Sequence, residues 1–384
     1  MTVSTFTPDF SNDEYETRTS NAQKAMQDEG LDALFFTTEA EVRYFTGFRT
    51  LFWQSPTRPW FLIVPRKGKP IAVIPLIGAH LMQTTWLDDI RTFSAPHPTD
   101  DGVALLKDAL ASYNNIGMLM GRESCLRMPL RDFERLRDAL PGSQFTDATA
   151  LVQRLRMIKS EAEIAHLREI CAIGSRAFDK APALFYEGQT LEDVFRAFRI
   201  ELLQQGAEDV PYLVGGAGPE GYLDVISPPT SQRLQRGDVL MLDTGASKRG
   251  YFCDFDRNFS VGAPNETVQR SHQKLVEAIS EATKVARPGK TCADIYSAMA
   301  RYLNQSNSDV GRSGHGLGMQ LTEAPSLTDF DHTLLEEGMV LTLEPSLDLG
   351  DGKMMVHEEN IVIRQGTPEF LSKPASPDIY VIER

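Results

Sequence analysis

The sequence predicts an α/β (α+β) protein with two domains, a mixed α/β domain over residues 1–155 and a larger domain over residues 156–384. Three observations support this prediction. The 384 residues exceed one ordinary domain. Strand-type and helix-type patterns alternate through roughly the first 150 residues. A helix start then follows, because Ser160 and Glu163 have the spacing of a capping box.

The N-terminal domain is predicted from short apolar runs that alternate with amphipathic segments. A basic turn at residues 66–69 (RKGK) joins two of the runs into a hairpin. Helices are expected over 12–30, 100–110 and 130–140, and strands over 31–38, 60–65, 70–76 and 115–120.

One loop of this domain, residues 47–60, carries four aromatic side chains and two arginines. Aromatic and arginine side chains on a loop suit recognition, which makes Trp53 and Arg58 candidate substrate contacts. The same composition suits a domain or subunit interface equally well. Both interpretations stay open on the sequence alone.

The C-terminal domain is predicted around a hairpin at residues 239–259, where two apolar runs flank a glycine-containing loop at 244–250. The first strand carries Asp243 and the second carries Asp254. Period-2 alternation puts Asp254 and Asp256 on one face of the second strand. An acid in so apolar a strand is costly unless it is paired or binds a metal. A hairpin with two solvated acids is the simpler alternative.

Further helices are expected over 191–204, 267–286 and 292–304, in addition to the one that begins at Ser160. The glycine-rich run at 214–221 lacks the strand–GxGxxG–helix context of a dinucleotide-binding loop. We therefore expect no dinucleotide there.

Composition argues against several classes of protein. The formal net charge is −14, from 39 basic and 53 acidic residues, which argues against a nucleic-acid partner. No run approaches the roughly 20 apolar residues that cross a bilayer, and no signal-peptide pattern is visible. The four cysteines have neither CxxC nor framework spacing. We therefore expect a cytoplasmic protein without a membrane partner.

Three more segments carry candidate metal ligands. His315 lies between glycines in SGHGLG, Glu344 ends the apolar run GMVLTLEP, and Glu358 follows KMMVH. A lone histidine or strand-end glutamate is more often structural. Together with Asp243 and Asp254, however, they make four carboxylates and one imidazole, whose charge would balance two divalent ions. Such ligands suit Mn, Fe, Co or Zn, and two ions roughly 3.5 Å apart activate water in aminopeptidases.

These five residues and their flanking sequences resemble the M24 family, which contains methionine aminopeptidase, aminopeptidase P, prolidase and creatinase. The segment EGLDALFFTTEAEVRYFTGF is similar to the creatinase N-terminal domain, and KSEAEIAHLREI is similar to the entry helix of the second domain. The resemblance implies a creatinase-like domain over 1–155 and a "pita-bread" catalytic domain over 156–384. It also implies a homodimer, in which one subunit's N-terminal domain can wall the other's site.

The resemblance further implies a role for each of the five residues. Asp243 would bind one metal, and His315 and Glu344 would bind the other. Asp254 and Glu358 would bridge both ions. A hydroxide between the metals would attack the carbonyl of an amide or peptide C–N bond, with Glu344 and His315 as the candidate catalytic residues. Two divalent ions are expected, manganese first, with iron, cobalt or zinc as alternatives.

The sequence departs from the family where substrate binds. Peptidases of the family carry a second histidine seven residues after His315, where this chain has Thr322, and an earlier one in a region where residues 224–229 contain none. Threonine cannot replace imidazole near neutral pH. Asp256 stands where the family commonly has threonine, and supports a ligand or contacts a cationic substrate. The candidate substrate-binding residues are therefore Thr322, Asp256, Trp53 and Arg58.

Two functional hypotheses result. The intact ligand set favours a metal-dependent hydrolase of the Xaa-Pro dipeptidase or aminopeptidase type. The missing histidines and the aromatic loop favour a small-molecule enzyme on the same fold, similar to ectoine hydrolase, creatinase or dimethylsulfoniopropionate lyase, because rings and carboxylates suit a small zwitterion. A binding module would be expected to lose ligands, and none is missing. The expected partner is a small peptide or a small-molecule amide.

Overall fold

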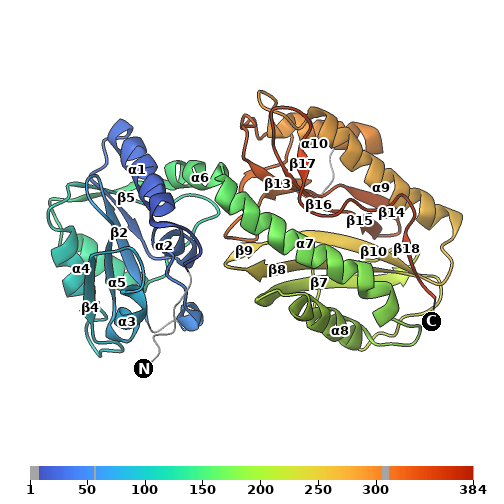
Figure 1. Cartoon of the computed structure of the whole chain (residues 1–384), viewed down its shortest axis with the longest axis horizontal. Helices are drawn as coiled ribbons and strands as arrows, with labels where there is room; N and C mark the ends of the chain where they lie inside the picture. Colours follow the sequence, from blue (N-terminus) through green and yellow to red (C-terminus); the bar gives the residue numbers. More distant parts are fainter. Residues whose placement is uncertain (1–7, 56–57, 305–310, 384) are drawn as a thin grey trace. The chain divides into compact units, whose positions relative to one another are not determined.

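The computed structural model describes residues 8–55, 58–304 and 311–383. The chain forms two compact units, Met1–Arg156 and Met157–Arg384, which we describe separately (Figure 1). In the described ranges, no helix combines the length and the apolar character needed to cross a membrane.

The N-terminal unit is built from one mixed sheet and the helices around it. The strands are β1 (Ala33–Phe36), β2 (Phe61–Pro65), β3 (Ile71–Pro75), β4 (Asp89–Phe93), β5 (Asn115–Met118) and β6 (Gln144–Asp147). The helices are α1 (Asn12–Asp28), α2 (Glu39–Thr46), α3 (Ala79–Met82), α4 (Val103–Leu110), α5 (Leu130–Asp138) and α6 (Thr149–Met157), with short 3-10 turns at Leu51–Gln54 and Leu76–Gly78.

The six strands lie in the order β4-β3-β2-β1-β5-β6. β1 pairs antiparallel with β2 and parallel with β5, so a hairpin and crossover connections share the sheet. Apolar side chains of β1, β2 and β5 pack against α4 and α5, while α1 and α2 lie on the other side of the sheet (Figure 1). Phe35, Phe61 and Leu106 are buried in this core.

The predicted mixed α/β character of this unit is confirmed. Each predicted helix and strand forms with boundaries shifted by a few residues, and the RKGK turn joins β2 and β3 as expected. The elements α2, α3, β4, β6 and α6 were not predicted. β4 (DIRTF) and β6 (QFTD) lie half-buried at the two sheet edges, so neither needs the apolar run that marks a central strand.

The described residues of the C-terminal unit form four long helices and three sheets. The helices are α7 (Glu161–Leu184), α8 (Leu191–Gln204), α9 (Glu266–Val285) and α10 (Cys292–Leu303). The strands before α9 are β7 (Asp209–Pro219), β8 (Asp238–Lys248), β9 (Tyr251–Phe252) and β10 (Phe255–Val261). Those after α10 are β11 (Gly314–Gly316), β12 (Glu323–Ser326), β13 (Val340–Leu343), β14 (Ser346–Gly350), β15 (Lys353–Val356), β16 (Glu359–Val362), β17 (Glu369–Phe370) and β18 (Tyr380–Ile382).

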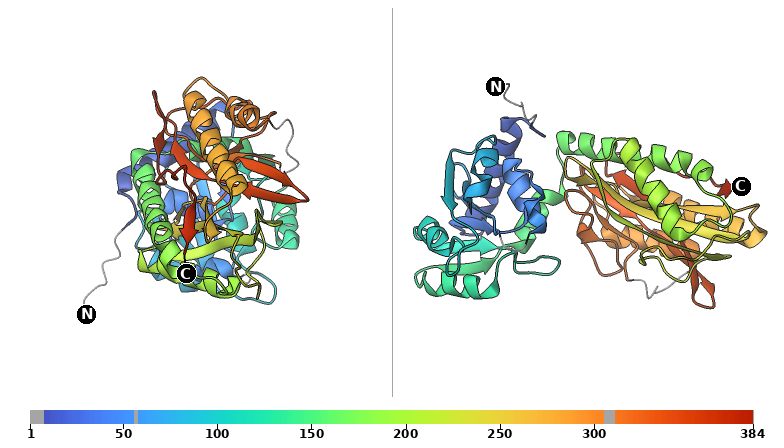
Figure 2. Two further views of the ribbon diagram at one scale, coloured as in Figure 1. Left: turned by 90° about the vertical axis from the view of Figure 1, so that its right-hand side faces the viewer. Right: turned by 90° about the horizontal axis from the view of Figure 1, so that it is seen from below.

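One sheet has the order β18-β10-β8-β7 with β9 on β8, a second has the order β12-β11-β13-β16-β17, and β14 pairs with β15. Helices α7 and α8 (green) and helices α9 and α10 (orange) lie on opposite sides of these strands (Figure 2). A buried cluster packs α9 and α10 against β13 and β16, through residues that include Ile279, Ile295, Leu341 and Ile361.

The capping box at Ser160 is confirmed, because its side chain accepts from Glu163 N and the Glu163 side chain accepts from Ser160 N. The predicted hairpin is also confirmed, but β8 continues to Lys248 and leaves a turn of only Arg249 and Gly250. The turn is shorter than expected because residues 244–248 pair with neighbouring strands.

The glycine-rich run at 214–221, for which no strand was expected, belongs largely to β7. Glycine is disfavoured in strands unless a backbone must approach closely. That is the case here, because a Cβ on Gly215 would lie 2.1 Å from Met241 O and one on Gly216 would lie 2.7 Å from Asp224 O. The strand-like run at 353–362 forms two strands, interrupted at His357 and Glu358.

Candidate metal centre

The five residues expected to bind metal come together in the C-terminal unit from both of its large sheets. Asp243 lies on β8, Asp254 between β9 and β10, His315 on β11, Glu344 directly after β13, and Glu358 between β15 and β16. Two groups of their side-chain atoms each lie within 4.8 Å of one another. The first group is Asp254, His315 and Glu344, and the second is Asp243, Asp254 and Glu358.

Asp254 belongs to both groups. Its Oδ2 lies 3.3 Å from His315 Nε2, and the same imidazole nitrogen lies 2.9 Å from Glu344 Oε1. The hairpin register explains how Asp254 reaches this point, because β10 pairs with β8 from Phe255 opposite Thr244 onward. The two acids of the hairpin are thereby brought to the same end of one strand pair.

Local backbone geometry brings His315 into the cluster. Gly314 has a φ of +141° and a Cβ there would lie 2.2 Å from Thr342 O, so a larger residue would be strained and would push β11 away from β13. His315 itself pairs with Thr342 on β13. Its Nδ1 lies 2.9 Å from Gly316 O, which leaves Nε2 directed at the carboxylates.

The electrostatics of the cluster are those of crowded negative charge. Burial, followed by the charges of Asp254, Asp256 and Glu344, raises the pKa of Asp243 well above its ordinary value. Burial also raises the pKa of Asp254 to about 6, although His315 opposes the shift.

The pKa of Glu358 is raised by burial and then by Asp243 and Glu344. Burial alone would lower the pKa of His315, but Glu344 and Asp254 outweigh it and raise that pKa to about 10. The carboxylates therefore repel one another unless a cation lies among them.

Unsatisfied oxygens indicate that the cluster suits a cation. Asp243 Oδ1 and Glu358 Oε2 are buried and accept no hydrogen bond. Buried polar atoms without partners are costly and rare in native proteins. Carboxylate oxygens with one imidazole are ligands that divalent Mn, Fe, Co or Zn accept. The residues present therefore fit a divalent metal centre.

Several residues behind the cluster were not singled out by the sequence. Asn360 hydrogen-bonds the backbone N–H of Asp254 at 3.1 Å, and Arg257 donates to Glu358 O at 3.0 Å. The phenol of Tyr212 interacts with the Asp243 carboxylate. No spacing in the sequence connects residues that lie about a hundred positions apart, so only the DFDRN and HEEN segments themselves offered a signal.

The other candidate residues occupy different places. Thr322 is half-buried in the turn between β11 and β12. Asp256 is fully buried, with Oδ1 2.9 Å from Glu358 N. Trp53 and Arg58 belong to the N-terminal unit, where Trp53 packs on Trp60 with ring centroids 6.0 Å apart. Their contact with substrate stays a prediction.

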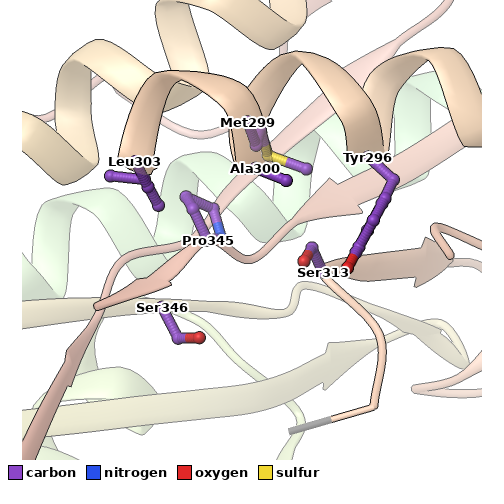
Figure 3. A pocket seen from close by; sticks show the side chains of 7 residues that line it. All are labelled: Tyr296, Met299, Ala300, Leu303, Ser313, Pro345 and Ser346. Atoms are coloured by element: carbon purple, nitrogen blue, oxygen red, sulfur yellow. The ribbon is translucent and has the colours of Figure 1, made fainter. Parts of the chain in front are cut away.

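A small pocket lies beside the centre, between α10 and the chain segments that lead to and from the cluster (Figure 3). Pro345 follows the candidate ligand Glu344, and Ser313 precedes His315 by two positions. None of the lining side chains belongs to the candidate ligand set. The lining residues are Tyr296, Met299, Ala300, Leu303, Ser313, Pro345 and Ser346.

Buried carboxylates and one imidazole, brought together from two sheets, are the ligand set of a divalent-metal site. Comparison with known proteins agrees. Residues 165–365 match the model of metallopeptidase family M24, and residues 18–158 match the creatinase/prolidase N-terminal domain. The chain belongs to metallopeptidase family M24, and the predicted family and fold class, with a pita-bread C-terminal domain, are confirmed.

Its relatives include peptidases. The chain is similar to the probable dipeptidase PepE of Mycobacterium tuberculosis, at 28% identity over 92% of this chain and 93% of that protein. It is similar to the Xaa-Pro dipeptidase of Pyrococcus horikoshii, at 28% identity over 66% of this chain and 73% of that one. The crystal structure of dipeptidase PepE from Mycobacterium ulcerans superposes with a TM-score of 0.84 at 25% identity, covering 98% of this chain and all of the other.

Proposed function

We propose that this protein is a metal-dependent Xaa-Pro dipeptidase or aminopeptidase that works with two divalent ions, manganese first among Mn, Fe, Co and Zn. The observation that carries the proposal is that Asp254 is shared by two compact groups of candidate ligands. A shared carboxylate is what a pair of neighbouring ions requires. The names of the relatives support a peptide substrate.

The candidate ligands divide between the two ions. Asp243 would hold one ion, His315 and Glu344 the other, and Asp254 and Glu358 both. When bound, the ions would supply Lewis acidity that polarises the scissile carbonyl and activates water. The buried, unpaired oxygens of Asp243 and Glu358 support this assignment.

The side chains then have separate tasks in hydrolysis. Glu344 is more exposed than the other four candidate ligands, so its carboxylate is the one that substrate and water reach. In our proposal the Glu344 carboxylate takes a proton from the attacking water and delivers it to the departing nitrogen as the C–N bond breaks and the C–O bond forms. His315 Nε2 lies 2.9 Å from Glu344 Oε1, so both side chains would hold the same ion.

Substrate binding is assigned to the residues around this centre. Thr322 offers a hydroxyl to the peptide where the family's peptidases have a histidine. Trp53 and Arg58 would contact substrate within a homodimer, which size-exclusion chromatography with light scattering tests. We also propose a cytoplasmic location, supported by the absence of a disulfide framework among the four cysteines. The small-zwitterion alternative gains no support from the relatives.

Elemental analysis of protein purified without chelator, combined with a dipeptide panel, tests the proposal. We expect about two first-row metal ions per chain and faster cleavage of Xaa-Pro than of Xaa-Ala dipeptides. Bound metal without any dipeptide cleavage would contradict the peptidase proposal and favour the small-zwitterion hypothesis. Absence of metal, with activity unchanged by chelator, would overturn the metal-dependent mechanism.

A further inference from the structure

Two strand edges of the C-terminal unit face each other without a backbone ladder between them. The first half of β10 belongs to one sheet, and residues 356–360 run from β15 into β16, which belong to the other sheets. Among the described residues, no backbone pairing joins β10 to β15 or β16. The metal cluster lies where these edges meet, because Asp254 comes from one edge and Glu358 from the other.

We call the boundary between the first half of β10 and residues 356–360 the seam. At both of its ends, side chains replace backbone pairing. At one end, Asn360 Oδ1 accepts from Asp254 N at 3.1 Å, and the same amide donates to Asp254 O. At the other end, Asn258 Nδ2 donates to Val356 O at 2.6 Å. Val356 N donates to the hydroxyl of Tyr222 at 2.6 Å, which in turn donates to Asn258 at 3.2 Å. Both backbone groups of Asp254 and of Val356 are therefore satisfied by side chains.

Asp256 makes the middle rung. Its Oδ1 accepts from Glu358 N at 2.9 Å, while Arg257 Nη1 donates to Glu358 O at 3.0 Å. Asp256 Oδ1 also lies 3.3 Å from His357 Nδ1. The other nitrogen of that imidazole lies 3.3 Å from Glu359, which Arg257 binds at 3.0 Å. Buried acids and bases thus alternate around the backbone of Glu358.

The three rungs have a regular register. Residue 254 faces 360, residue 256 faces 358, and residue 258 faces 356. This is the stepping of an antiparallel strand pair, with a side chain inserted between the two backbones. Asp254 and Glu358, the two carboxylates expected to bridge the metals, are each held through the backbone by a side chain from the opposite edge.

We propose that Asp256 is a positioning residue for Glu358, which fixes the backbone of this candidate bridging ligand and so sets the affinity of the centre for divalent metal. The proposal rests on the proposed function. It assigns Asp256 to support of a ligand and not to contact with a substrate cation.

Burial and hydrogen bonding favour this assignment. Asp256 has no exposed surface, so no substrate reaches it in this unit. Its contact with Glu358 is to the backbone and not to the carboxylate. Replacing a residue that holds a metal ligand in place typically weakens metal binding about 10- to 100-fold.

Two replacements of equal shape test the role. Asp256→Thr keeps an oxygen that accepts from Glu358 N, and Asp256→Val has the same shape without that acceptor. Both remove the charge, so their comparison isolates the hydrogen bond. Mn²⁺ alone is titrated into chelator-treated protein by calorimetry, and thermal unfolding of the metal-free variants is recorded beside it.

Asp238→Val is the matched control. Asp238 is also buried on the same sheet, and its Oδ2 accepts from Gln235 N at 2.8 Å, but it makes no contact with the cluster. We expect Asp256→Val to bind Mn²⁺ about 10- to 100-fold more weakly than Asp256→Thr. Asp238→Val should lower the unfolding temperature and leave Mn²⁺ affinity unchanged.

Equal Mn²⁺ affinity in the Thr and Val variants would overturn the positioning role while leaving the proposed function intact. Loss of affinity in Asp238→Val of the same size would overturn it as well, because general destabilisation would then explain the effect. Failure of the parent protein to bind any of Mn²⁺, Fe²⁺, Co²⁺ and Zn²⁺ would overturn the proposed function and this inference with it. Should Asp256→Val not fold, Asp256→Ala, which also lacks the acceptor and the charge, takes its place with weaker binding expected.

Discussion

Glu358 and Glu359 are neighbours in the chain and both are buried, yet their surroundings differ completely. Glu358 faces other acids, so that burial and the charges of Asp243 and Glu344 raise its pKa, and its Oε2 has no partner. Burial would also raise the pKa of Glu359, but Arg257 and His357 outweigh it and hold that pKa at about 2.

The comparison separates two uses of buried charge. The protein satisfies Glu359 completely, since its oxygens accept from Arg257, Ser372 and the backbone of Ala375. Glu358 Oε2, in contrast, is buried without a hydrogen-bond partner. Consecutive side chains of an extended chain point to opposite faces, so Glu358 belongs to the candidate metal centre and Glu359 to a structural network.

The largest expected effect comes from replacing a carboxylate of the candidate metal centre. Glu358→Gln and Asp254→Ala should abolish dipeptide hydrolysis, because each removes a carboxylate expected to serve both ions. Without metal, Glu358→Gln should unfold at a urea concentration no lower than the parent, since the repulsion with Asp243 and Glu344 is relieved. Assays with added Mn²⁺ and urea unfolding in chelator measure the two effects. Full activity in either variant would contradict the two-ion proposal.

Replacing Glu359, whose oxygens all have hydrogen-bond partners, should lower the free energy of unfolding instead. Glu359→Gln leaves Arg257 buried without its partner, and breaking a buried ion pair costs about 3–5 kcal/mol. Urea unfolding of the metal-free variant measures this loss. Glu369→Gln is the control, because its pairs with Arg364 and Arg168 are partly exposed and should contribute about 1 kcal/mol or less. A stable Glu359→Gln variant would show that the network is dispensable.

His272 is a third buried titratable group, and it makes the free energy of unfolding depend on pH. Burial, followed by the charge of His357, lowers the pKa of His272 from 6.5 to about 4, although the hydrogen bond that His272 Nε2 donates to Ser376 O opposes the shift. The unfolded chain therefore takes up a proton at higher pH than the folded protein. The contribution of His272 to the free energy of unfolding is fully present above pH 6.5. It is lost as the pH drops towards 4, by about 3 kcal/mol in total.

Urea unfolding of the metal-free protein between pH 8 and about pH 4 checks this expectation. Replacing His272 by Gln removes the titrating group, so the variant should lose that part of the slope. An identical slope in parent and variant would assign the pH dependence to other groups.

The smallest expected effect comes from Thr322, a candidate substrate-binding residue. Thr322→His restores the imidazole that the family's peptidases carry at this position. We expect Xaa-Pro cleavage to rise, by up to about 100-fold if the imidazole takes part in proton transfer. Steady-state kinetics of both proteins provides the measurement, with Thr322→Asn as the control for size and polarity. No gain would indicate that this chain orients its substrate differently.

Much of the fold follows from local patterns in the sequence. The helices α8, α9 and α10 match their predicted ranges to within a residue, since amphipathic periodicity and caps such as Asn265 and Thr291 are local signals. The strand β7 was missed because glycines that lower strand propensity are required there by the closeness of β8. Edge strands with polar sequences were missed for lack of an apolar pattern.

The side chains that cluster in the candidate site were singled out from the sequence, but the residues behind them were not. Asp243, Asp254 and His315 occur in recognisable segments, and the structure brings them together with the two glutamates. The rungs formed by Asn258 and Asn360 join residues 98 and 106 positions apart, and each is a single side chain meeting a backbone group. A polar side chain in a strand does not reveal which distant backbone it will meet.

The seam between the two sheets has a consequence for motion. In a backbone ladder, an amide is released to solvent only when whole strands separate, whereas the amides of Asp254, Val356 and Glu358 are each held by one side chain. Rotation of that side chain alone frees them. Their hydrogen exchange should therefore be faster than that of the β8–β10 ladder beside them. Side chains thus join the edges that carry Asp254 and Glu358, while backbone pairing holds the strands within each sheet.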